Sequence, residues 1–339
     1  NSIGAGVFYN TPKLKTLKYD GYTETDNILH QNVQYLGGYA FVNSGLENLT
    51  AKGLQEIYSN GFNAAGFASI DLESTSVQTI NDSMFANLSR LTSVKLPSGL
   101  KTIGASAFEG SGISNIIVPE TLTTIGKAAF KNSAIKDISL VKVTNIGASA
   151  FEGCKSLTRA VLGNSIEELP DSLFKGCSSL KEFTIPEKVS IIGDDCLLGT
   201  AIENLTIPAK LTNLGVGALG SSAIKSVSVD SGNKTFKVED NFLENTAGKL
   251  IAYLGSESEV TLPVSDAGVA DGVFAGNTSI KKITLPETVK TVTSNMFYGC
   301  LGVETIVLDG VTTIDANAFD GCVNLKNIMI PSSVTSIAA

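Results

Sequence analysis

The sequence predicts a solenoid, in which short segments of chain form coils that stack on one another. Three observations support this fold class: a large apolar residue recurs every 21 to 23 residues, an aliphatic residue usually precedes it by five positions, and a third track has the spacing apolar-x-x-apolar-x-apolar. Three tracks with one period are typical of repeat architectures. The large apolar positions are Phe8, Phe41, Phe62, Phe85, Phe108, Phe130, Phe151, Phe174, Leu197, Leu219, Phe242, Phe274, Phe297 and Phe319.

These positions divide residues 1–339 into about 14 coils of a single repeat domain. Two steps are longer, 33 residues from Phe8 to Phe41 and 32 from Phe242 to Phe274. We expect the additional residues, near 20–34 and 243–259, to protrude as loops or hairpins, where repeat proteins often place specificity. The competing interpretation is solvated decoration that binds nothing. Both chain ends fall inside a repeat, so we also expect a fragment of a longer chain.

Each coil is expected to contain one short strand. In the track Leu91, Val94, Leu96, the last two residues alternate, so both face one side of a strand while Ser93 and Lys95 face the other. Proline has no N–H, so it ends a strand early. Many strands are closed in this way, by Pro97, Pro119, Pro186, Pro208, Pro263, Pro286 and Pro331.

A tight turn is expected in the second half of each coil. The segment 104–108 combines small residues with one phenylalanine, which favours a 3₁₀ turn or a short α-helix lying close to the neighbouring coil. The predicted fold is therefore a β-rich, right-handed coil stack with one short strand and one short 3₁₀ or helical turn per repeat. Stacking is essential because one coil cannot bury its apolar residues alone.

Two stretches carry a family resemblance. Residues 146–157 read Ile-Gly-Ala-Ser-Ala-Phe-Glu-Gly-Cys-Lys-Ser-Leu, and residues 319–325 repeat the pattern Phe-Asp-Gly-Cys-Val-Asn-Leu. With strands that end in Leu-Pro or Val-Pro, these motifs resemble the BspA-like leucine-rich repeats of bacterial surface proteins, and the likeness covers essentially the whole chain. The resemblance implies a leucine-rich-repeat solenoid, a secreted or cell-surface location, and a role in adhesion through protein contact. The motif indicates a fold far more strongly than a function.

Composition argues against several classes of partner. The chain has 25 Lys and Arg against 33 Asp and Glu, and its net charge of −8 contains no basic block. Nucleic acid is therefore an unexpected partner. No stretch approaches the roughly 20 continuous apolar residues of a membrane span. Residues 1–6 do not resemble an export signal, so we expect any such signal to be missing from this sequence.

No residue pattern indicates catalysis, a metal or a cofactor. The only histidine, His30, has no identifiable nucleophile, and the acidic pairs at 167–168 and 194–195 are explained by turn polarity. Four of the five cysteines occupy one repeat position, Cys154, Cys177, Cys300 and Cys322. Buried free thiols are favoured, with disulfides between neighbouring coils and a metal site as alternatives. The protein is accordingly predicted not to be an enzyme.

The best-defined candidate surface is the row of side chains that face outward from the strands. The row is polar and contains almost no aromatic residues, which is poor material for a tight interface. Its candidate binding residues are Lys95, Asn115, Ile117, Asp137, Arg159, Val161, Glu182, Asn204, Lys282 and Thr305.

Three functional hypotheses remain open at this stage. The resemblance favours a secreted or surface adhesion module that contacts host proteins, extracellular-matrix proteins or another cell-surface protein. The second hypothesis is a structural spacer that displays another domain. The third is a carbohydrate-related module, for which the absence of tryptophan is unfavourable.

Overall fold

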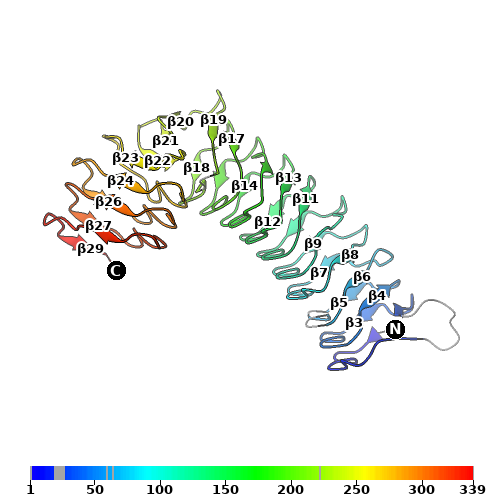
Figure 1. The fold of residues 1–339 in the computed structure, drawn as a ribbon. Coiled ribbons are helices and arrows are strands. Elements are labelled where there is room, and N and C mark those ends of the chain that lie inside the picture. The colour runs from blue at the N-terminus through cyan, green and yellow to red at the C-terminus, as the bar shows by residue number, and fades with distance from the viewer. Residues whose placement is uncertain (1, 19–26, 59, 63–64, 221–222, 339) are drawn as a thin grey trace. The chain divides into compact units, whose positions relative to one another are not determined.

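The computed structural model describes residues 2–18, 27–58, 60–62, 65–220 and 223–338. The chain divides into two compact units. The N-terminal unit consists of Asn1–Ile166 and Gly176–Phe183, and the C-terminal unit consists of Glu167–Lys175 and Thr184–Ala339. Each unit is a stack of coils with its own parallel ladders. Figure 1 labels many of the strands that form them.

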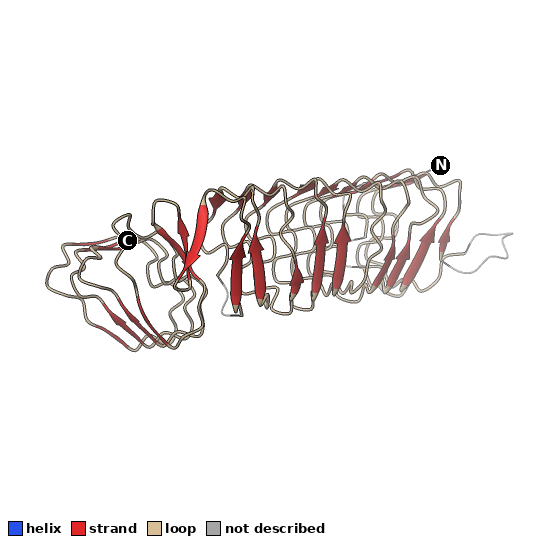
Figure 2. Ribbon diagram, turned by 90° about the horizontal axis from the view of Figure 1, so that it is seen from above, coloured by secondary structure: helices blue, strands red, loops and turns tan. Residues whose placement is uncertain are grey.

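The N-terminal unit contains two rows of parallel strands, which are visible in Figure 2. The first row carries the outward residues predicted from the sequence, and we call it the long-strand row. It consists of β2 (Ile28–Leu29), β4 (Asn48–Ala51), β6 (Ser69–Asp71), β8 (Ser93–Lys95), β11 (Asp137–Leu140), β13 (Arg159–Leu162) and β15 (Glu182–Phe183). The second, the short-strand row, consists of β1 (Ser2–Ile3), β3 (Tyr35–Leu36), β5 (Glu56–Ile57), β7 (Thr79–Ile80), β9 (Thr102–Ile103), β10 (Thr124–Ile125) and β12 (Asn145–Ile146).

The C-terminal unit repeats this plan around an inserted antiparallel sheet. Its longer strands are β17 (Asn204–Ile207), β19 (Ser226–Val229), β23 (Glu259–Thr261), β24 (Lys282–Thr284), β26 (Thr305–Val307) and β28 (Asn327–Ile328). Its shorter strands are β14 (Glu168–Leu169), β16 (Ile191–Ile192), β18 (Asn213–Leu214), β25 (Thr291–Val292), β27 (Thr313–Ile314) and β29 (Ser336–Ile337). The inserted sheet is formed by β20 (Phe236–Glu239), β21 (Phe242–Asn245) and β22 (Leu250–Tyr253).

The solenoid predicted from the sequence is confirmed, and the recurring phenylalanines form its core. Phe108 and Phe130 are fully buried, and their ring centroids lie 5.1 Å apart with the planes inclined by only 6°. The same stacking recurs in the C-terminal unit, where Phe274 and Phe297 are 5.7 Å apart. Each such burial contributes roughly 1.5–3 kcal/mol, and a stacked pair adds about 0.5–1.5 kcal/mol.

The turn that was expected to be helical has a different backbone. No helix occurs in the described parts of the chain. In the coil around Phe108, alternate N–H groups donate to carbonyls of the next coil, from Ser106 to Lys127 at 2.8 Å and from Phe108 to Ala129 at 2.7 Å. Ser106 also has a positive φ of 52°, which interrupts helical geometry. The turn therefore joins the ladder between coils and forms no helix of its own.

The structure contains a second strand per coil, which was not predicted from the sequence. The aliphatic track five positions before each phenylalanine lies on it, as for Ile103 and Ile125, which pair in the parallel ladder of β9 and β10. These strands are only two residues long. Two residues are too few to show alternation, so this sheet has no periodicity signal of its own.

The inserted sheet of the C-terminal unit is joined to the coil stack through β22. Tyr253 N donates to Val273 O at 2.7 Å, and Leu250 forms a parallel bridge with Val269. Phe242 on β21 packs edge-on against Phe274 at 6.1 Å. The insertion is thus partly buried, and its apolar residues extend the core of this unit.

Candidate functional site

The long-strand row presents its predicted residues to solvent by simple alternation. On β13, Arg159 is exposed and Val161 is half-buried, while Ala160 and Leu162 point into the core. The parallel register pairs Asp137 with Arg159, and Arg159 with Glu182. Neighbouring coils therefore align side chains that are 22 or 23 residues apart in sequence.

Opposite charges meet along this row. The guanidinium of Arg159 lies 3.5 Å from Asp137 Oδ2 and 3.5 Å from Glu182 Oε2. Lys95 Nζ lies 2.9 Å from Asp71 Oδ2, and its hydrogen bond to that carboxylate raises the pKa of Lys95. Exposed ion pairs contribute only about 0–1 kcal/mol each, so they define the charge pattern more than they stabilise the fold.

The remaining three candidate residues lie in the C-terminal unit. Asn204 Oδ1 accepts a hydrogen bond from Ser226 Oγ at 2.7 Å, and Lys282 Nζ is 3.8 Å from Glu259 Oε2. Thr305 is exposed on β26. The structure thus distributes the ten predicted residues over two units, seven in the N-terminal unit and three in the C-terminal unit.

The long-strand row of the N-terminal unit is interrupted between β8 and β11. Residues 113–118, which correspond to a strand in the neighbouring coils, form no strand. Lys136 N donates to Ser114 O at 2.9 Å, but within the described part of the chain the backbone groups of residues 115–118 form no backbone hydrogen bond. Ile116 and Val118 are half-buried, whereas the equivalent Ile138 and Leu140 are fully buried.

A difference in connection length coincides with this interruption but does not cause it alone, because β24 and β26 pair across an equal difference. Seven positions separate Val118 from Ile125 on the next short strand, but only six separate Leu140 from Ile146. Both short strands stay in register in one ladder, so the mismatch must be absorbed in the connections or in the long-strand row. The backbone of residues 115–118 separates from β11 where those connections begin.

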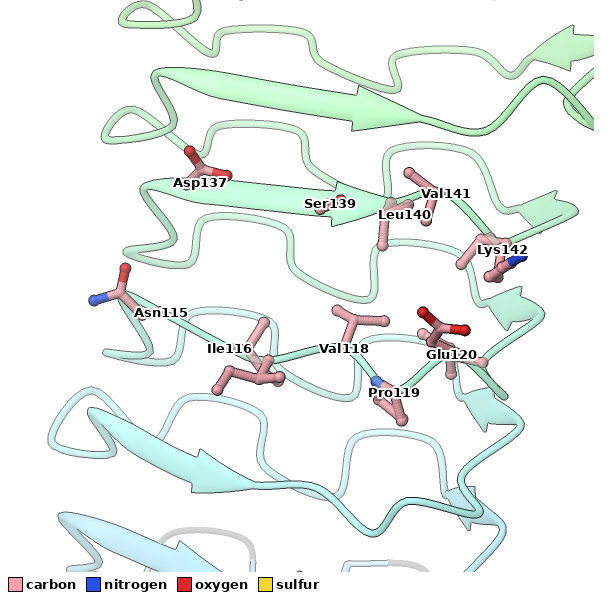
Figure 3. A pocket seen from close by; sticks show the side chains of 13 residues that line it. Asn115, Ile116, Val118, Pro119, Glu120, Asp137, Ser139, Leu140, Val141 and Lys142 are labelled. Carbon is pink, nitrogen blue, oxygen red and sulfur yellow. The ribbon is translucent and has the colours of Figure 1, made fainter.

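The separation leaves an open hollow of about 400 Å³. Figure 3 shows its two walls, one formed by the segment from Asn115 to Glu120 and the other by β11 with Val141 and Lys142. Three predicted residues, Asn115, Ile117 and Asp137, line it. We call this place the ladder gap.

The ladder gap combines exposed apolar side chains with unpaired backbone. Ile117 is 89% exposed and Val141 is 51% exposed. Glu120 and Lys142 provide charges of both signs at the end near the connections. Val141, Glu120 and Lys142 were missed by sequence reasoning, which considered only residues inside the expected strands. The shorter connection after Leu140 is not a sufficient signal, because an equally short one follows Leu308 in a coil whose strands pair.

The cysteines satisfy carbonyl groups of the phenylalanine stack. Cys154 Sγ donates to Phe130 O at 2.9 Å, and Cys300 Sγ donates to Phe274 O at 3.0 Å. All five cysteines are free thiols. This repeated hydrogen bond accounts for the cysteine position in the repeat motif, because each thiol pairs a carbonyl of the preceding coil.

The described residues include the single histidine, His30, and all five cysteines. Within them, no three or more His, Cys, Asp or Glu side chains are arranged to hold a metal ion. No helix there is long and apolar enough to cross a bilayer. His30 Nδ1 accepts a weak hydrogen bond from Asn32 N at 3.3 Å. Much of the first insertion, residues 19–26, lies outside the described residues, and with it Tyr22, Glu24 and Asp26.

Stacked coils with parallel strands and inward apolar rows define the class of this protein as a leucine-rich-repeat solenoid. The profile of the BspA type Leucine rich repeat region, in 6 copies, matches residues 1–136, 123–247 and 252–339. The chain belongs to this family. A comparison with curated proteins finds no match.

Several solved structures have the same fold. A leucine-rich repeat protein from Bacteroides ovatus is 24% identical, with 96% of this chain and 89% of that chain covered and a TM-score of 0.52. A leucine rich cell surface protein from Faecalibacterium prausnitzii is 22% identical over 99% and 87%, with a TM-score of 0.51. The pneumococcal vaccine antigen PcpA is 22% identical over 90% and 64%, with a TM-score of 0.50. At these identities the likeness shows the fold alone.

Proposed function

We propose that this chain is a secreted or cell-surface binding module that mediates adhesion by contacting other proteins and performs no catalysis. Its family and the description of one similar structure as a cell surface protein support the location. The partners we propose are host or extracellular-matrix proteins, or another cell-surface protein. A passive spacer is the competing function, and it would have no such ligand.

The ladder gap is the observation that carries this proposal. A strand edge with unpaired N–H and C=O groups can bind an extended peptide through main-chain hydrogen bonds, while side-chain pockets supply specificity. The gap offers unpaired backbone at residues 115–118 beside two exposed apolar side chains, Ile117 and Val141. An extended segment of a partner protein can therefore pair with this backbone and bury both side chains.

The charged part of the row lies directly beside the gap. Asp137 lines the hollow and also contacts Arg159, which contacts Glu182 in turn. A partner that approaches the gap thus meets a fixed series of negative, positive and negative groups. Such patterns affect association rate and specificity more than affinity.

The test is a binding screen of the purified chain against extracellular-matrix and plasma proteins at physiological salt. For a ligand found in this way, Ile117→Asp combined with Val141→Asp is expected to weaken binding roughly tenfold or more, the equivalent of about 1.4 kcal/mol. Val323→Asp is the matched control, since Val323 is an exposed valine in the C-terminal unit. A screen without any saturable ligand would favour the spacer, and a ligand insensitive to the double variant would place binding elsewhere.

A further inference from the structure

A second face of the N-terminal unit carries exposed tyrosines. Tyr35 on β3, Tyr39 and Tyr58 are 38%, 53% and 49% exposed. The β3 and β5 strands are parallel neighbours with Tyr35 opposite Glu56, and Figure 1 shows both at the N-terminal end of the chain. Tyr58 follows β5 immediately. Coil stacking therefore brings together rings that are up to 23 residues apart in sequence.

Alternation directs this group outward together. Leu36 and Ile57 are buried in the core, so their neighbours Tyr35, Glu56 and Tyr58 face solvent. Tyr39 and Asn60 hold equivalent turn positions with positive φ, and Asn60 Nδ2 lies 3.5 Å from Tyr39 Oη. The three rings consequently belong to two adjacent coils of one surface. This surface is the short-strand row and is distinct from the outward side of the long-strand row.

An open polar hollow of about 550 Å³ lies at Tyr35, which is the one of these three tyrosines that lines it. Its walls come from three successive coils and consist of Tyr35, Gln55, Glu56, Ser76, Gln78, Thr79 and Asn81. Tyr35 Oη donates to Gln55 Oε1 at 3.5 Å, and Asn81 Nδ2 donates to Ile57 O at 2.6 Å. Among the described residues, the amide N–H groups of Gln55, the carbonyl oxygen of Asn81 and the side chain of Gln78 have no further side-chain partner.

This combination of groups matches the chemistry of a sugar. A pyranose ring presents C–H groups on one face, which pack against an aromatic ring, and hydroxyls at its edge, which need both donors and acceptors. Tyrosine rings supply the flat apolar surface. The side-chain amides of Gln55 and Gln78 and the carboxylate of Glu56 supply directional hydrogen bonds.

The charge of the lining indicates which class of sugar could bind. Among the described residues that line the hollow, Glu56 alone is charged, and its charge is negative. An acidic saccharide would be repelled, whereas a neutral one is compatible with the lining. Tyrosine can anchor a protein interface as well as a sugar, but the rest of this lining is polar and contains no arginine, which favours a sugar.

We propose that the hollow at Tyr35, with the adjacent Tyr39 and Tyr58, is a binding site for a neutral oligosaccharide. The site is open and shallow, so affinity is expected to be modest and to increase when several sugar units span more than one coil. It is independent of the ladder gap, because none of its lining residues is shared with it.

The experiment titrates the full chain with soluble oligomers of β-glucose, α-mannose and N-acetylglucosamine, and with a sialylated oligosaccharide for comparison. Calorimetry and ligand-observed NMR report binding. We expect saturable binding to at least one neutral oligomer and a roughly tenfold loss for Tyr35→Ala, because this variant removes the ring against which the sugar packs. Tyr35→Phe should keep most of the affinity, and the Tyr35→Ala, Tyr58→Ala double variant should lose binding.

Two controls separate this site from other surfaces. Tyr9→Ala removes a tyrosine of the same unit that is 57% exposed and does not line the hollow, so it should bind normally. Ile117→Asp should also leave sugar binding unchanged, which distinguishes failure here from failure of the protein-binding function. The proposal is overturned by a blank across the neutral oligomers, by a preference for the sialylated sugar, by undiminished binding of the double variant, or by a protein ligand that requires these tyrosines.

Discussion

At the scale of single residues, burial determines the chemistry of three of the five cysteines. Burial raises the pKa of the Cys322 thiol to about 11, and it raises the pKa values of the more deeply buried Cys196 and Cys300 well above their ordinary range. The thiolate is the reactive form of cysteine, so all three groups are held in an unreactive state near neutral pH. Cys300 donates the carbonyl hydrogen bond described above, and Cys322 donates the equivalent bond to Phe297 O at 3.2 Å.

This predicts slow alkylation of the folded protein. At pH 8, iodoacetamide should modify Cys322 first, because it is the only half-exposed cysteine, and should reach Cys196 and Cys300 only after unfolding. Peptide mapping by mass spectrometry against time measures the order. Reaction of Cys322 at the rate of a free thiol at pH 8 would contradict its raised pKa.

The same shift has a consequence for stability. Because the pKa of Cys322 is higher in the folded state than its ordinary value of 9.0, the folded state binds the proton more tightly. This contribution to the free energy of unfolding is complete below pH 9 and is lost as pH rises from about 9 to about 11. Cys322→Ala should therefore lose less stability over this interval than the parent protein, as measured by denaturant unfolding.

At the scale of elements, the central contrast is between β13 and the missing strand at residues 115–118. Both segments have apolar residues in alternation, yet only β13 pairs with neighbours on both sides. Hydrogen exchange should show this difference directly. Amides of residues 115–118 should exchange about two orders of magnitude faster than those of Ala160–Leu162. In the described part of the chain they donate no backbone hydrogen bond that would have to break before exchange. Equal protection of the two segments would mean that the ladder is closed in solution.

Some features of these elements could be predicted from the sequence, and others could not. Phe108, Ile138 and their equivalents could be predicted as core residues because buried positions recur at a fixed spacing and are occupied by apolar side chains. The turn around Ser106 was not predicted correctly. The carbonyl groups that accept its hydrogen bonds lie in another coil, and the local sequence gives no information about them. The ladder gap could not be predicted, because the one-residue difference in connection length found there also occurs between coils whose strands pair. The tyrosine hollow required knowing which short segments become neighbours in the short-strand row.

At the scale of the whole molecule, stability is approximately a sum over neighbouring coils, so the stack depends on every close approach between them. In the C-terminal unit, the coil at Gly220 contacts the coil at Gly276 directly, although the inserted sheet lies between them in sequence. A Cβ at Gly276 would lie 3.0 Å from the carbonyl carbon of Gly220 and 2.2 Å from Leu198 Cδ1. Glycine at this position therefore lets the coils on either side of the insertion approach each other closely.

A matched pair of substitutions tests whether the coil stack depends on the close approach at Gly276. Gly276→Ala and Gly268→Ala both place a side chain at positive φ, 74° and 81° respectively, which costs about 1–2 kcal/mol in either case. A Cβ at Gly268 has open space around it, so only Gly276→Ala also forces two coils apart, at a further cost of about 1–3 kcal/mol. Denaturant unfolding should rank the variants accordingly. Hydrogen exchange should locate the additional loss in the C-terminal unit, in the coils that flank Gly276. Equal destabilisation by the two substitutions would show that the coils on either side of the insertion do not depend on this contact.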